Sequence, residues 1–160
     1  MTTFTVAANE QKTIVLDQAG EYEVVLAGEG AHVNVEGRFR ASNAQNLIVS
    51  VVLRHQAAHT RAVTTLKGVV SDKAFLQFTG RIIIEENCGD SNSFLTERIL
   101  LLSEKARAEA IPDLEIKSSD VKCSHAASIS SIPKDQLFYL QSRGIAETDA
   151  QQLIIEGFLA

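Results

Sequence analysis

Cys123 and His125 are the two residues whose types and spacing point most directly to chemistry. One residue separates them, so on a β-strand both side chains would point to the same face of the sheet. Thiolate and imidazole are good ligands for iron or zinc. Two ligands make at most half of a closed metal site, so Cys88 or a second chain would have to supply the rest. The alternative interpretation is a small apolar cysteine in the core beside a hydrogen-bonded histidine.

His55 and His59 form a second arrangement with a suggestive spacing. Four residues apart, they would share one face of either a helix or a strand. A two-histidine metal site is one hypothesis, and a polar strand face with hydrogen-bonded imidazoles is the other. The chain contains no GxSxG, HExxH or CxxC motif and no phosphate-binding glycine loop, so no familiar catalytic signature is present.

Several acidic residues suggest a glycosidase hypothesis, because many β-solenoids cleave polysaccharides. These residues are Glu85, Glu86, Asp90, Asp113 and Glu115. Glycoside hydrolysis needs two carboxylates held at a fixed separation, and nothing in the sequence pairs these groups. The chain also has no tryptophan and only 2 tyrosines with which to form a platform for sugars.

The composition describes one globular domain without features of a membrane or nucleic-acid-binding protein. A length of 160 residues allows one substantial core, and the net charge of −5 opposes phosphate binding. No stretch approaches the ~20 apolar residues of a membrane span, and no basic and apolar leader opens the chain. Two cysteines far apart in sequence form no disulfide framework. We therefore expect a cytoplasmic protein with no nucleic-acid or membrane partner.

Residues 1–132 read almost throughout as short β-strands. Valine, isoleucine, threonine and phenylalanine are frequent, and stretches such as "YEVVLAGEGAHVNVEGRF" alternate apolar and polar residues. Few of the breaks are Asn-Gly or Asp-Gly hairpin turns, and the apolar runs recur at a loose spacing of about twenty-odd residues. We predict a mainly β protein with a right-handed β-helix (β-solenoid) core, with a β-sandwich as the alternative.

Residues 133–160 predict a C-terminal α-helical hairpin attached to this 1–132 core. Pro133 suits the first turn of a helix, and Gly144 suits the left-handed residue that ends one. Beyond Gly144, an apolar stripe with helical spacing runs from Ala150 to Phe158. The chain ends with this second helix still in phase, so we expect the 133–160 segment to be truncated.

The second half of the chain resembles the core domain of the SufB/SufD proteins. Four landmarks carry the resemblance in order: "LLLSEKA" (100–106), "IPDLEI" (111–116), "DVKCSHAA" (120–127), and "LFYLQSRGI" (137–145) followed by "EGF". Fainter similarity continues upstream from His55 to Ile84. The first fifty or so residues match only in their strand character.

This resemblance implies a role in cytoplasmic iron–sulfur cluster assembly. In that family, SufB and SufD share a β-helix core, pair through it, and dock the ATPase SufC through C-terminal helices. The implied partners are a SufC-like ATPase and either a SufB-like subunit or a second copy of this chain. The resemblance implies no catalysis by this chain and a transient iron–sulfur cluster in place of a tightly bound cofactor. The candidate docking residues on the helices are Leu137, Phe138, Leu153 and Phe158.

The wording "DVKCSH" resembles SufD, where the histidine is a candidate cluster ligand at the interface with SufB. Ala106 is the nearest match to the sulfur-receiving cysteine of SufB, so that role does not carry over. His125 and Cys123 remain the candidates for a cluster, metal or interface role. Two rival functions stay open: a metal-dependent or carbohydrate-active β-solenoid enzyme, and a purely structural domain that dimerises.

Overall fold

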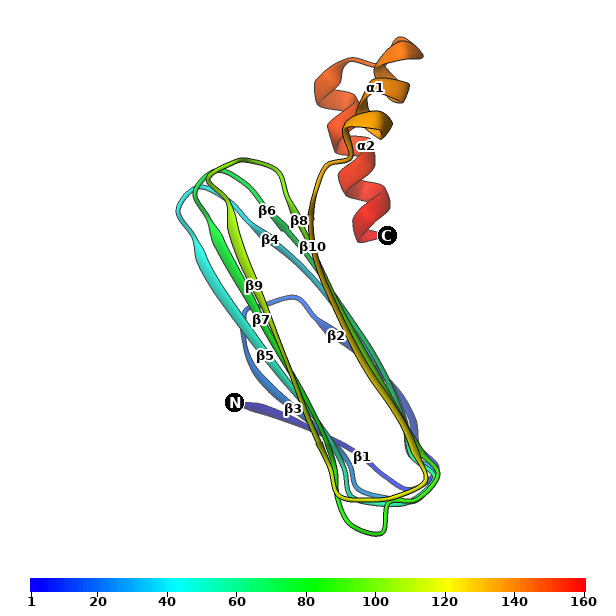
Figure 1. Cartoon of the computed structure of the whole chain (residues 1–160). Coiled ribbons are helices and arrows are strands. Elements are labelled where there is room, and N and C mark those ends of the chain that lie inside the picture. The colour runs from blue at the N-terminus through cyan, green and yellow to red at the C-terminus, as the bar shows by residue number, and fades with distance from the viewer.

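The computed structural model describes residues 1–160, which form ten β-strands followed by two helices. The strands make two parallel five-stranded sheets that face each other, and the chain alternates between the sheets strand by strand (Figure 1). The odd-numbered sheet contains, in order, β1 (Thr2–Val6), β3 (Gly20–Leu26), β5 (Asn46–His55), β7 (Phe75–Ile84) and β9 (Arg107–Ile116). The even-numbered sheet contains β2 (Gln11–Leu16), β4 (His32–Ala41), β6 (Arg61–Val70), β8 (Ser91–Leu101) and β10 (Val121–Ser131). The predicted mainly β solenoid is confirmed.

The coils of the solenoid lengthen along the chain. Thr2 pairs with Tyr22, which lies 20 residues later. Asn46 pairs with Phe75, 29 residues later, and Phe75 pairs with Arg107, 32 residues later. The expected spacing of twenty-odd residues is therefore correct for the first coil and wrong for the later ones. The reason is strand length, which grows from 5 residues in β1 to 11 in β10.

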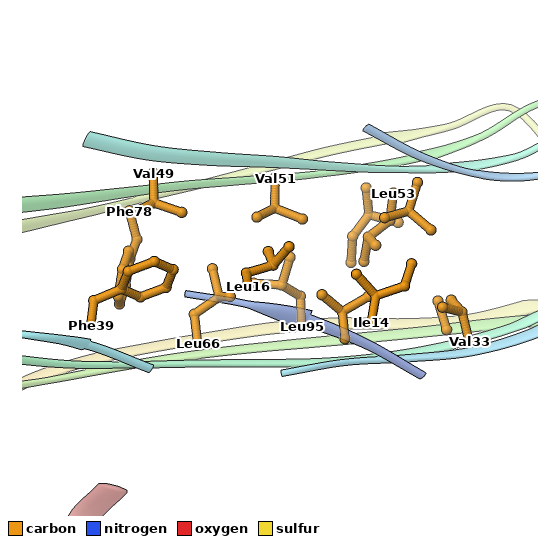
Figure 2. Close-up of a cluster of buried hydrophobic side chains, with 14 of the residues drawn as sticks. Ile14, Leu16, Val33, Phe39, Val49, Val51, Leu53, Leu66, Phe78 and Leu95 are labelled. Carbon is orange, nitrogen blue, oxygen red and sulfur yellow. The ribbon is translucent and has the colours of Figure 1, made fainter. Parts of the chain in front are cut away.

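The core is a layer of apolar side chains enclosed between the two sheets. In β4, buried and exposed residues alternate at every position, as the pleat of a half-buried strand requires. Figure 2 shows Val49, Val51 and Leu53 from β5 pointing toward side chains of the opposite sheet. The rings of Phe39 and Phe78 meet edge to face with their centroids 5.5 Å apart. Burial of each such side chain contributes roughly 1.5–3 kcal/mol, and this burial holds the sheets together.

The turns from the odd-numbered to the even-numbered sheet also repeat once per coil. Each contains one residue with a left-handed backbone: Asn9, Gly30, His59, Asp90 and Asp120. Glycine adopts this conformation readily, and Asn, Asp and His are enriched in it. Backbone hydrogen bonds stack the turns, since Asp90 N–H donates to Asp120 O at 2.8 Å.

The predicted helical hairpin is present as α1 (Lys134–Ser142) and α2 (Glu147–Leu159). Gly144 lies between them with a φ of 85°, in agreement with its predicted left-handed conformation. Figure 1 shows both helices beyond one end of the strands, with the C-terminus directed back toward the even-numbered sheet. Neither helix has the length and apolar character needed to cross a membrane.

α2 anchors the hairpin to the outer face of the even-numbered sheet. Ile155 and Leu159 form a small apolar cluster with Val69 and Leu100 of the strands. Arg38 Nε donates a hydrogen bond to the backbone oxygen of Leu159 at 2.7 Å. This positive charge lies at the C-terminal end of α2, where it also interacts favourably with the helix dipole.

Gly68 tests how tightly the two sheets pack. A Cβ atom at Gly68 would lie 2.2 Å from Leu76 Cδ2 and 3.1 Å from Phe78 Cζ. We expect Gly68→Ala to lower the free energy of unfolding by about 1–3 kcal/mol, measured by urea denaturation. The control is Gly89→Ala, because nothing lies within 4 Å of a Cβ at Gly89. Equal stability of the two variants would contradict this description of the core.

Candidate functional site

The solenoid ends at β9 and β10, and each of these strands pairs on one side only. β9 hydrogen-bonds to β7, and β10 hydrogen-bonds to β8. Both strands therefore present a free edge of backbone N–H and C=O groups. Large apolar side chains are exposed on the same two strands, with exposed fractions of 46% for Leu114, 44% for Ile116 and 44% for Ile129. We call this region, formed by β9 and β10, the open end.

Cys123 and His125 both lie on β10 and face inward, as their shared parity predicts. Cys123 pairs with Ser93 of β8, and His125 pairs with Leu95. Cys123 is partly buried and packs against the apolar core, and this burial raises the pKa of its thiol. The His125 side chain is only 2% exposed, although it belongs to the last coil.

Glu97 on β8 is the neighbour of His125 that sequence reasoning missed. Its Oε2 atom lies 3.2 Å from His125 Nε2, and its side chain is 0% exposed. Their orientation forms no hydrogen bond, and both carboxylate oxygens and both imidazole nitrogens lack a partner. Burial raises the pKa of Glu97 to about 7 and lowers the pKa of His125, so burial favours the uncharged form of each group.

The space for Glu97 and His125 exists because the opposite strand carries a glycine. A Cβ atom on Gly80 of β7 would lie 2.7 Å from Glu97 Oε1 and 2.7 Å from His125 Cε1. The signal that could have identified Glu97 is its parity. It continues the inward series Ser93, Leu95, Glu97, in which a charged residue is out of place.

The two-histidine site predicted at His55 and His59 is not formed, because β5 ends at His55. His55 is fully buried and its Nδ1 atom lies 2.7 Å from Thr60 Oγ1. His59 lies in the following turn with a φ of 57°, where its exposed side chain contacts Asp90 at 3.0 Å. The strand-parity argument was wrong here because it carried a strand past its end.

Cys88 does not complete a site with Cys123 and His125. Its thiol donates to the backbone oxygen of His55 at 3.4 Å, at the turn before β8. No group of three or more His, Cys, Asp or Glu side chains is arranged to hold a metal ion. Any ion at the open end would therefore need further ligands from outside this set of side chains.

The acidic residues considered for glycoside cleavage form ion pairs instead. Arg54 and Lys117 both contact Glu85, at 2.7 and 3.0 Å, and these contacts lower the pKa of that carboxyl. Glu115 contacts Lys117 at 2.9 Å, and its pKa is lowered too. A glycosidase acid needs a raised pKa, so neither carboxyl suits that role.

The helical candidates divide into two groups. Phe138 on α1 is 72% exposed and Leu153 on α2 is 50% exposed. Phe158 is partly buried, with the guanidinium of Arg98 lying 5.1 Å from its ring centroid. Leu137 is also partly buried. Phe138 and Leu153 are therefore free to contact a partner, whereas Phe158 covers the solenoid.

Comparison with known proteins places this geometry in a family. Residues 7–158 match the model of the SufBD core domain of the SUF system for iron–sulfur cluster assembly. The chain belongs to the SufB/SufD family. It is 39% identical over 108 residues to the iron–sulfur cluster assembly protein SufD of Escherichia coli, covering 68% of this chain. It is 34% identical over 146 residues to SufD of Bacillus subtilis, covering 90% of this chain.

This SufB/SufD chain corresponds to only part of its relatives. It spans 26% of the Escherichia coli protein and 33% of the Bacillus subtilis protein. A SufBD family protein of Synechocystis is 36% identical over 109 residues, which cover 68% of this chain and 24% of that protein. The matched part is the solenoid and its helices, which contain the open end.

His55 provides a test of the buried polar groups in this SufB/SufD solenoid. Burial lowers the pKa of His55 to about 4, so the folded protein leaves it neutral where the unfolded chain binds a proton. The free energy of unfolding should therefore fall as pH drops from about 6.5 to about 4. About 3 kcal/mol of this fall should be missing in His55→Gln, measured by urea denaturation at each pH.

The matched control is His32→Gln, which removes an exposed imidazole on β4. It should follow the wild-type pH dependence, because that side chain contacts water in both the folded and the unfolded chain. If His55→Gln also follows the wild-type curve, the buried neutral state of His55 is wrong.

Proposed function

We propose that this chain is a SufD-like scaffold component of cytoplasmic iron–sulfur cluster assembly that pairs through the open end with a SufB-like subunit or with itself. It would perform no catalytic turnover, and a SufC-like ATPase docked on its helices would hydrolyse ATP. Its membership of the SufB/SufD family supports this role. The single observation that carries the pairing is the pair of free strand edges on β9 and β10.

The open end has the properties of a surface that needs a partner. Unpaired backbone groups on 10- and 11-residue strands are a template for further strands. Exposed Leu114, Ile116 and Ile129 add apolar surface to these edges, and burying that surface would favour association. A second solenoid that ends in the same way would continue both sheets and cover the apolar side chains together.

A nascent cluster, as cargo, would be held between the two paired ends. His125 and Cys123 belong to the last coil, so no further coil of this chain separates them from a partner. Both imidazole nitrogens of His125 lack hydrogen-bond partners, which leaves them available to iron. The raised pKa of Cys123 means that iron would have to displace the thiol proton on binding.

The helices offer a separate surface for the ATPase. No residue of α1 is buried, and α2 buries only the side that faces the strands, through residues such as Ile155 and Leu159. Phe138 and Leu153 extend from the remaining surface. Large apolar residues exposed on a helix pair that is already anchored are suited to a protein contact.

Leu114→Glu tests pairing through the open end. A carboxylate there would lose water on association without gaining a partner, which is costly. We expect the variant to bind the SufB-like subunit at least about tenfold more weakly than wild type in calorimetric titration. Val15→Glu is the control, because Val15 is 63% exposed on β2, in the coil at the opposite end of the stack. Wild-type affinity of Leu114→Glu, or equal losses in both variants, would remove this interface.

Phe138→Ala and Leu153→Ala test the docking of a SufC-like ATPase. If these side chains anchor the contact, each substitution should weaken binding by about 1–2 kcal/mol or more. The control is Ile48→Ala, since Ile48 is 48% exposed on β5, away from the helices. Unchanged affinity in both helix variants, with helical circular dichroism intact, would show that the ATPase binds elsewhere.

A further inference from the structure

Glu97 is an anomaly within the solenoid. Of the 20 aspartate and glutamate residues of the chain, it is the only one that is fully buried. Buried carboxyl groups are costly unless they are hydrogen-bonded, paired or bound to a metal. Neither oxygen of Glu97 has a hydrogen-bond partner. The group therefore lacks the compensation that its burial normally requires.

The contact with His125 does not supply that compensation as a hydrogen bond. Glu97 Oε2 and His125 Nε2 are 3.2 Å apart, but the orientation of the two groups forms no hydrogen bond. Bonds of about 2.0–2.2 Å from one metal ion to a carboxylate oxygen and an imidazole nitrogen place those donors roughly 2.9–3.4 Å apart. The observed separation is thus the spacing of two neighbouring ligands on a single ion.

The surroundings preserve room for this pair. Gly80 leaves the opposite strand without a side chain, and a Cβ there would approach Glu97 Oε1 and His125 Cε1 at 2.7 Å each. Alanine at this position would displace the two groups. The glycine is required by the pair itself, because the strand around it, β7, is otherwise lined on its inner face by large apolar residues such as Phe78 and Ile82.

We propose that Glu97 Oε2 and His125 Nε2 together form a half-site for a divalent first-row metal ion, with ferrous iron as the physiological occupant. Imidazole with carboxylate is a donor set that suits ferrous iron. This inference rests on the proposed function for the identity of the ion, and it adds Glu97 to the ligands. The remaining coordination positions would be filled by water, sulfide or donors from a paired subunit.

The experiment is a calorimetric titration of the full chain with Co²⁺, an oxygen-stable substitute for ferrous iron, before and after substitution. Wild type should bind one ion per chain. Glu97→Gln and His125→Ala should each weaken that affinity by at least about tenfold. The controls are Glu109→Gln and His32→Ala, which remove an exposed carboxylate on β9 and an exposed imidazole on β4. Both controls should bind Co²⁺ as wild type does.

Thermal unfolding with and without Co²⁺ guards against a folding defect. An ion that binds only the folded chain should raise the Tm of wild type and of both controls, and leave the two ligand variants unchanged. Wild-type affinity in Glu97→Gln, or the absence of stoichiometric binding by wild type, would overturn the half-site.

These results are separable from the test of the proposed function. The titration needs only the isolated chain, whereas pairing needs a second subunit. If Glu97→Gln binds Co²⁺ normally while Leu114→Glu still abolishes pairing, Glu97 is excluded as a ligand and the scaffold role stands. If the ligand variants lose Co²⁺ but wild type neither pairs nor accumulates iron and sulfide with a SufB-like subunit, the half-site stands without that role.

Discussion

Parallel hydrogen bonding between successive coils fixes which residues of this chain lie beside one another. Because the pairing is in register, Ser93 lies beside Cys123 and Leu95 beside His125, and all four point inward. The same bonding continues only as long as there is another strand to accept it. At β9 and β10 it stops, and two free edges remain. The position of the inward polar residues and the existence of the open end therefore have a common origin.

Strand alternation in the sequence was sufficient to predict the solenoid and the shared face of Cys123 and His125. It failed at His55 and His59, where even spacing was correct but the strand ended between the two residues. Parity is reliable only within an element, and the left-handed backbone at His59 redirects the chain. The left-handed conformation of His59 repeats that of its stacked neighbours, a register that one sequence does not reveal.

Glu97 could not be assigned from the sequence for a different reason. A charged residue in a strand is normally read as outward-facing, and only the register of β8 establishes that this one faces the core. Its relation to Gly80 joins two sheets, so it depends on how the coils close around the core. The helices were predictable as elements from their apolar spacing, but which side packs on Val69 and Leu100 depends on that docking geometry.

The unequal lengths of the coils limit how such solenoids can assemble. β1 and β2 offer edges of 5 and 6 residues, whereas β9 and β10 offer 10 and 11. Head-to-tail stacking would therefore join a narrow face to a wide one and leave about half of the wide strands unpaired. Two wide faces match each other in length, and their union consumes both. The taper thus favours a closed pair over an open-ended fibre, which is the hazard of any exposed parallel sheet.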